Sequence, residues 1–154
     1  MAFRIEHRIG VQAPAALIWG LITDIDRWSE WNPLYPQASG RIGLGETLNL
    51  TLALPDEAPR SIAPKVVDWE PDAQVVWRLD LMPVLAYTVR YLEIEALSET
   101  GCVFNNGEFF HGVVGERVGK SKRRAIHGGF TQLGEAVKAR AEAAYRASRG
   151  EPAA

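Results

Sequence analysis

Several features of secreted or membrane-inserted proteins are missing from this sequence. Cys102 is the only cysteine, so no intramolecular disulfide can form, which suits a reducing compartment. The most apolar run, Leu79 to Val89, is interrupted by an aspartate and a proline and is far shorter than the roughly 20 residues that span a bilayer. Arg4 and Glu6 occupy the place where a signal peptide needs its apolar stretch. We therefore expect a cytoplasmic protein without stable membrane insertion.

Signals for nucleic-acid, metal or cofactor binding are also weak. The formal net charge of -2 gives no general attraction for nucleic acid. His7, His111 and His127 are widely separated and fit no spacing that brings metal ligands together. The sequence has no G-x-S-x-G motif, and Cys102 has no basic neighbour that would activate its thiol. We expect no nucleic-acid partner, no metal and no cofactor.

The residues that are present predict one compact domain. The chain has 154 residues, 47% of them hydrophobic, with five tryptophans, which is enough to build a sizeable core. No linker or repeat divides it. We expect a single domain over residues 1–149 and a frayed tail over 150–154.

The periodicity predicts strands between two helical segments. Alternation over 3–11 is typical of a half-buried strand, and apolar residues at three- and four-residue steps predict a short helix at about 14–23. Turn residues then divide the middle into strand-length pieces. The tail from about 117 to 147 has an apolar stripe at helical spacing and predicts one long amphipathic helix.

Alternation also predicts which faces of the strands lie inside. The aliphatic sets at Leu48 to Leu54, Val75 to Leu81 and Leu92 to Ala96 are expected to point inward. The strand from Cys102 to Gly112 mixes polar and aromatic residues on both faces, so its inward face stays open. A strongly curved sheet around one long helix encloses more space than its side chains must fill, which favours an internal pocket.

The sequence resembles the START-like (SRPBCC) superfamily, which includes polyketide cyclase/dehydrase-type and lipid-transport proteins. Its most specific residues, similar to the first helix and the W-x-x-W-N-P turn of that superfamily, are Ile18, Trp19, Leu21, Asp24, Trp28, Trp31, Asn32 and Pro33. Weaker similarities are Glu108, Phe110 and Gly112 at the end of the last strand, and Gly129 to Lys138 in the closing helix. The resemblance implies an α+β helix-grip fold, with a curved antiparallel sheet of about six to seven strands around the C-terminal helix. It implies no universal active site.

The predicted cavity combines apolar walls with few polar groups. Its expected lining is Leu52, Trp77, Leu79, Leu92, Ile94, Phe104, Asn106, Glu108, Phe110, Phe130, Leu133 and Val137. If Phe104 and Phe110 point inward, the period of two carries Asn106 and Glu108 inward as well. A carboxyl in an apolar cavity has its pKa raised and can act as acid, base or anchor. Glu108 and His111 are the candidate catalytic residues, against an alternative in which Glu108 faces outward or pairs with an arginine.

Three further features have both a structural and a functional interpretation. Trp28, Trp31 and Asn32 are expected to pack in the core rather than to form a lid. Two glycines inside the last helix, Gly128 and Gly129, indicate close packing or a kink, because each costs about 1 kcal/mol relative to alanine. The basic cluster at the start of this helix, Lys120, Lys122, Arg123 and Arg124, is expected to be a solvated face, with an anionic ligand or a lipid headgroup as the alternative.

The leading hypothesis is a protein that binds a small hydrophobic or amphipathic ligand, such as a lipid, polyketide or aromatic metabolite. The second is an aromatase/cyclase- or dehydratase-type enzyme that uses the same cavity with a Glu or His as acid and base. The third is an interaction module whose interior is filled by its own side chains. An internal space no larger than a few waters would favour this third hypothesis and contradict the first two.

Overall fold

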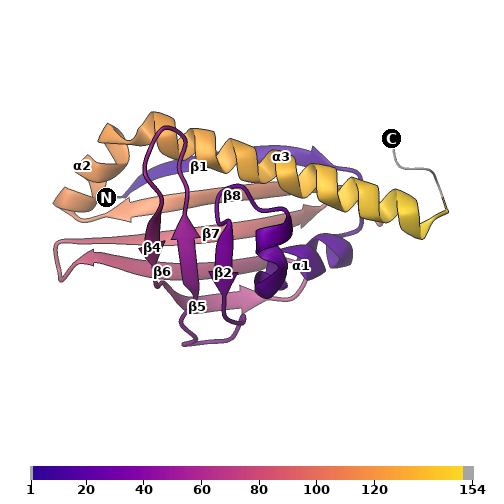
Figure 1. The fold of residues 1–154 in the computed structure, drawn as a ribbon, viewed down its shortest axis with the longest axis horizontal. Helices are drawn as coiled ribbons and strands as arrows, with labels where there is room; N and C mark the ends of the chain where they lie inside the picture. The colour runs from indigo at the N-terminus through magenta and orange to yellow at the C-terminus, as the bar shows by residue number, and fades with distance from the viewer. Residues whose placement is uncertain (1, 151–154) are drawn as a thin grey trace.

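The computed structural model describes residues 2–150 and contains eight strands, three α-helices and one short 3-10 helix (Figure 1). Of the expected tail, residues 151–154 lie outside the described residues. In chain order the elements are β1 (Phe3–Val11), α1 (Ala15–Thr23), η1 (Ile25–Glu30), β2 (Gln37–Ser39), β3 (Asn49–Leu52), β4 (Arg60–Ile62), β5 (Lys65–Glu70), β6 (Gln74–Met82), β7 (Ala86–Ala96), β8 (Cys102–His111), α2 (Val113–Ser121) and α3 (Arg123–Ser148).

The strands form two antiparallel sheets. The larger has five strands in the order β1-β8-β7-β6-β5, and the smaller has the order β2-β3-β4. The smaller sheet runs across the larger one in Figure 1, with its strands turned relative to those behind it. The expectation of a single sheet of six to seven strands therefore needs correction. The strands β2 to β4 are only three or four residues long, and an isolated bridge joins Thr47, just before β3, to Lys65 of β5 in the larger sheet.

Helix α3 lies along the inner face of the larger sheet and contacts β1 and β8. Its predicted stripe is buried as far as Ala141, since Ile126, Phe130, Leu133, Val137 and Ala141 are each at most 5% exposed. Ala144, the last residue of the predicted stripe, is exposed instead. Helix α1 contacts both α3 and β7. The helix-grip fold is thus confirmed, with the sheet and α3 enclosing one hydrophobic core.

The long helix predicted from 117 to 147 is interrupted. It is divided at Lys122, where φ is -104° and ψ is 11°, into α2 and α3. Gly112 precedes α2 with a φ of +83°, and a Cβ at this position would lie 2.2 Å from the carbonyl oxygen of Leu85. Only glycine fits there. Helix α2 therefore packs tightly against the start of β7.

The two glycines of α3 have different surroundings. A Cβ on Gly129 would lie 2.9 Å from Cδ1 of Leu34 and 3.1 Å from Cδ2 of Leu54. A Cβ on Gly128 would meet only Pro55, at 3.5 Å, an ordinary contact. Close packing is thus confirmed for Gly129, where the helix backbone touches the core.

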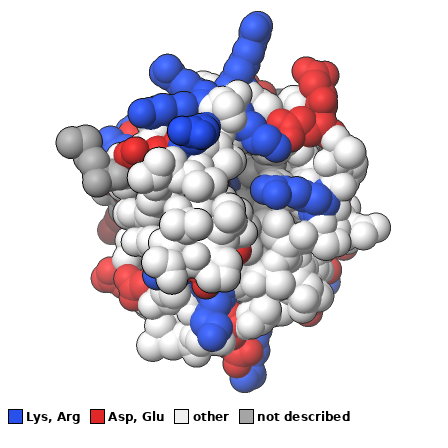
Figure 2. Space-filling view, turned by 90° about the vertical axis from the view of Figure 1, so that its left-hand side faces the viewer, with Lys and Arg blue, Asp and Glu red and all other residues white. Residues whose placement is uncertain are grey.

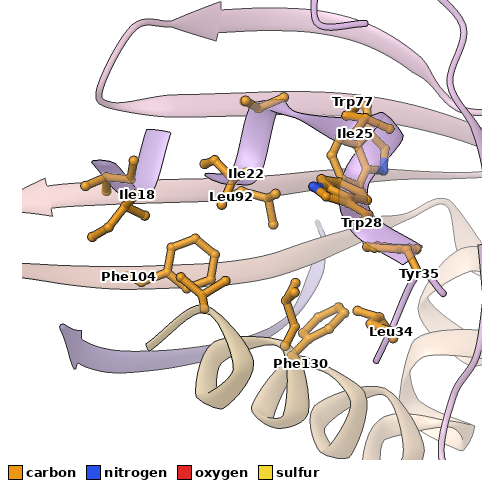
Figure 3. Close-up of a cluster of buried hydrophobic side chains, with 14 of the residues drawn as sticks. Ile18, Ile22, Ile25, Trp28, Leu34, Tyr35, Trp77, Leu92, Phe104 and Phe130 are labelled. Atoms are coloured by element: carbon orange, nitrogen blue, oxygen red, sulfur yellow. The ribbon is translucent and has the colours of Figure 1, made fainter. Parts of the chain in front are cut away.

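The aromatic residues after α1 pack in the core, as expected (Figure 3). Trp28 is 1% exposed, stacks on Tyr35 at 5.5 Å between ring centroids and lies 6.4 Å from Trp77. The buried Asn32 accepts hydrogen bonds from the backbone N–H groups of Leu34 and Tyr35. The turn is held by packing and by this side-chain cap.

Candidate functional site

A pocket lies between the inner face of the larger sheet, the smaller sheet and the region where α2 meets α3. Its lining residues are Tyr35, Leu52, Leu54, Arg60, Ile62, Trp77, Leu79, Leu81, Thr88, Glu108, Phe110, Val118, Lys122, Ile126 and Phe130. The cavity volume is about 40 Å³, enough for a few water molecules, and part of the pocket is open to solvent.

The walls of the pocket are largely apolar, and its mouth carries positive charge. Lys122 lines the pocket and donates a hydrogen bond from Nζ to Oε1 of Glu57 at 3.0 Å. Arg60, from β4, also lines it and is exposed. A ligand entering the pocket would meet these two cations before the apolar interior.

The register of β8 places one polar group inside the pocket. Phe104, Asn106 and Phe110 are all buried against the core, so Glu108 shares their inward face. Glu108 is only half-buried, but it lines the pocket, so part of its exposed surface faces that space. Removal from water raises the pKa of the Glu108 carboxyl, and nearby Arg90 offsets only part of this. A carboxyl with a raised pKa can exchange a proton with a bound molecule.

Behind the pocket lies a buried arginine. Arg90 is 1% exposed, and its guanidinium donates hydrogen bonds to Tyr35 Oη (3.0 Å), Tyr91 O (3.1 Å), Gly107 O (3.0 Å) and Asn106 Oδ1 (2.9 Å). Its guanidinium carbon also lies 4.0 Å from the centroid of the Phe130 ring. Arg90 is directly opposite Glu108 in the β7–β8 register, but no ion pair within 4.0 Å joins them in the described chain. Its charge therefore acts on Glu108 through space.

Thr88 is a second polar group in the pocket wall. Its side chain is almost fully buried. Its hydroxyl lies beside the Glu108 carboxyl and favours the charged form of that group. A polar atom of a bound molecule could contact both groups.

The predicted lining residues divide into two groups. Six of them line the pocket: Leu52, Trp77, Leu79, Glu108, Phe110 and Phe130. The other six, Leu92, Ile94, Phe104, Asn106, Leu133 and Val137, are buried deeper and do not line it. Among these, Asn106 also donates a hydrogen bond to the carbonyl oxygen of Phe130 at 3.2 Å. Asn106 thus joins β8 to α3 instead of offering its amide to a ligand.

The second candidate catalytic residue faces away from the pocket. His111 lies on the outer face of the larger sheet, where its ring stacks on Tyr87 with 4.5 Å between centroids. Strand alternation sends its side chain to the opposite side from Phe110. It therefore cannot act on a molecule in this pocket.

The sequence contained signals for some of the lining residues that were missed. The alternation through Leu79 continues to Leu81, and the alternation through Leu92 continues back to Arg90 and Thr88. Ile126 lies on the predicted helix stripe. Arg60 and Ile62 come from β4, which no turn or alternation signal marked.

Two other features are absent from residues 2–150. In that range, no cluster of three or more His, Cys, Asp or Glu side chains is placed to hold a metal ion. In the same range, no helix is both long and apolar enough to cross a membrane.

Comparison with known proteins identifies a family and a fold. Residues 2–142 match the family model described as "Polyketide cyclase / dehydrase and lipid transport". A search of the curated proteins gives no match. Among solved structures, the Zhui aromatase/cyclase from Streptomyces sp. R1128 is similar, with a TM-score of 0.69 and 15% identity over 94% of this chain and 98% of that chain.

Two further structures share the architecture. Norcoclaurine synthase from Thalictrum flavum aligns with a TM-score of 0.67 and 15% identity over 90% of this chain and 85% of its own. A START superfamily protein from Mycobacterium smegmatis aligns with a TM-score of 0.64 and 14% identity over 90% and 97%. At these identities the likeness establishes the fold alone.

Proposed function

The chain belongs to the polyketide cyclase/dehydrase and lipid transport family, and from this premise we propose that it binds a small hydrophobic or amphipathic molecule in the pocket described above. The observation that carries the proposal is an open pocket with apolar walls that contains a carboxyl with a raised pKa and, beside it, a buried hydroxyl. Few polar groups in an apolar wall are the usual composition of a small-molecule site.

Each part of the pocket has a distinct role in this proposal. The apolar walls supply affinity, since a ligand that buries about 200 Å² of apolar surface gains about 5 kcal/mol. Glu108 and Thr88 orient a hydroxyl or carbonyl group of the ligand. Arg60 and Lys122 at the mouth favour a molecule whose outer end is polar or anionic.

The narrow interior restricts the ligand. A cavity volume of about 40 Å³ holds only a few water molecules, so a larger ligand must extend toward the mouth or widen the pocket. By itself this volume matches the third hypothesis, in which the protein's own side chains fill the interior. The opening to solvent and the polar pair of Glu108 and Thr88 in an otherwise apolar wall favour the binding hypothesis instead.

Thermal-shift screening and native mass spectrometry test the proposal directly. Fatty acids, sterols and aromatic polyketides should be screened, since a ligand at a hundredfold its dissociation constant adds about 2.7 kcal/mol of stability. Leu79→Trp fills the pocket and should remove the shift. Leu97→Trp, at an exposed position, is the matched control and should keep it. No shift with any class of compound would support the filled-core hypothesis and contradict binding.

The second candidate function is an enzyme in which Glu108 moves a proton. The observation that favours it is the raised pKa of a carboxyl that faces the pocket beside Thr88. A first substrate set is the pair named with one structural neighbour, dopamine and hydroxybenzaldehyde, together with aromatic polyketide precursors. Glu108→Gln should abolish turnover of any compound that reacts, while ligand binding stays near normal. Unchanged turnover would exclude Glu108 as the acid or base.

A further inference from the structure

One end of the molecule carries a group of exposed apolar side chains. The turn between β6 and β7 presents Met82, Val84 and Leu85, and the start of α2 presents Val113 beside them. Val84 is 100% exposed and Val113 is 77% exposed. The tight contact between Gly112 and the carbonyl of Leu85 holds the two segments together. We call these four residues the apolar tip.

Val84 is an unexpected residue for this turn. Its φ is +67°, a left-handed conformation that a β-branched side chain adopts at a cost and that glycine or asparagine adopts readily. Turn geometry therefore does not explain an apolar residue here, and the exposed side chain buries no surface in the folded chain. A backbone outlier at an exposed tip points to a role outside the fold.

Basic residues adjoin the tip. Residues 113–124 contain five basic side chains and a single acidic one, Glu116. Four of the basic residues are exposed and form what we call the basic flank: Arg117, Lys120, Arg123 and Arg124. Figure 2 views this end of the molecule and shows Lys and Arg side chains gathered along its upper edge, next to a largely uncharged surface. The net charge of -2 is therefore unevenly distributed, with local positive charge beside the tip.

We propose that this end docks on the surface of a bilayer that contains anionic phospholipids. The apolar tip enters the interface, and the basic flank lies against the headgroups. Stable but reversible attachment to a bilayer needs two such signals, because neither a few apolar side chains nor a few charges suffices alone. Both occur here on adjoining segments, and no membrane-spanning helix is required.

The docking end also contributes to the wall of the pocket. Leu81, directly before the tip, lines the pocket, and so do Val118 of α2 and Lys122 next to it. A docked molecule would therefore hold this part of the pocket wall near the bilayer. Exchange of an apolar ligand with the lipid phase depends on the proposed binding function, but docking itself does not.

Vesicle co-sedimentation tests the docking. The full chain should bind vesicles of phosphatidylcholine with 30% phosphatidylglycerol and should bind pure phosphatidylcholine vesicles at least tenfold more weakly. The double variant Val84→Gly, Leu85→Ser should lower binding about tenfold or more. The glycine relieves the positive φ, so loss of the fold cannot explain the result. Leu97→Ser, at an exposed apolar position outside the tip, is the matched control and should bind normally.

Charge variants test the second signal. Lys120→Gln and Arg124→Gln should each weaken binding to the anionic vesicles about fivefold, and Lys65→Gln on the edge strand β5 should leave it unchanged. Equal binding by the tip variant and the unchanged chain would overturn the proposal. So would a dimer that sediments without vesicles and dissociates in the tip variant, because the tip would then bind a second copy. Leu79→Trp should retain vesicle binding, which separates a failure of docking from a failure of the pocket.

Discussion

Replacing Arg90 with methionine should lower the free energy of unfolding by about 3 to 5 kcal/mol. Methionine keeps much of the aliphatic volume of the side chain but removes the guanidinium. The four hydrogen bonds that the guanidinium donates are then lost, and a hydrogen bond from a charged donor contributes about 1.5 to 3 kcal/mol net. Tyr35 Oη and Asn106 Oδ1 are left buried without this donor.

An opposing effect reduces the loss. In the unchanged protein the Arg90 charge is buried, and among the described residues it has no ion pair within 4.0 Å. Burying such a charge costs several kcal/mol, and the methionine variant avoids this cost. Hydrogen bonds worth about 6 to 12 kcal/mol in total outweigh that relief. The contact with the Phe130 ring adds to the loss in the same direction.

Urea denaturation followed by tryptophan fluorescence measures the effect, because Trp77 lies 5.9 Å from the guanidinium and reports its surroundings. The midpoint should fall while the m-value stays constant. The double variant Arg90→Met, Asn106→Leu should recover part of the loss, since the unpaired amide oxygen is removed as well. A single variant as stable as the unchanged protein would refute the reasoning and show that desolvation of the guanidinium outweighs its hydrogen bonds.

Three other changes test individual features. Glu108→Gln should be more stable than the unchanged protein at pH 7, because a raised pKa makes ionisation of the Glu108 carboxyl cost stability as pH rises. The difference in stability should vanish below the ordinary carboxyl pKa of 4.5. Urea titrations from pH 4 to 8 measure this difference. Gly129→Ala should destabilise the protein by about 1 to 3 kcal/mol through its clash with Leu34, while Gly128→Ala should stabilise it by up to about 1 kcal/mol, both read as thermal midpoints. Burial lowers the pKa of His7, so the free energy of unfolding should fall as pH drops below 6.5. His7→Gln should flatten this pH dependence. An unchanged slope in the variant would show that another group causes the pH dependence.

The local sequence predicts which face of each strand points inward. It does not predict whether an inward side chain lies deep in the core or lines the pocket. Alternation places Leu92 and Phe104 inward, and both are buried. Whether an inward side chain reaches the pocket depends on which part of the sheet is covered by the smaller sheet and by α1. That arrangement is set by tertiary packing of very short strands such as β4, which periodicity cannot detect.

Arg90 occupies an inward strand position that an apolar pattern does not mark, because its side chain is charged. It occupies the same face of β7 as Leu92 and Ile94, so alternation alone places it inward. Charged residues are rarely fully buried, and an apolar pattern therefore omits them. The buried hydrogen-bond partners that make its position possible come from β8 and from the loop that carries Tyr35, far away in the sequence.

The break at Lys122 has no comparable signal. The predicted stripe continues through α3, and no proline lies near the junction. Helix α2 contacts β7 and β8, while α3 lies mainly along β1, so the two helices pack against different parts of the sheet. Val118, Lys122 and Ile126 from this junction line the pocket, so a break that the sequence does not signal contributes to the site.

The pairing of β1 with β8 has a consequence for the order of folding. Val11 is opposite Cys102, so about 90 residues separate the two partners, and closing such a loop costs about 4 kcal/mol of chain entropy. The strands β5 to β8 are joined by short turns and can pair with each other first. During synthesis, β1 therefore leaves the ribosome well before its partner β8 and pairs late, and until then the edge of β8 stays open to other chains.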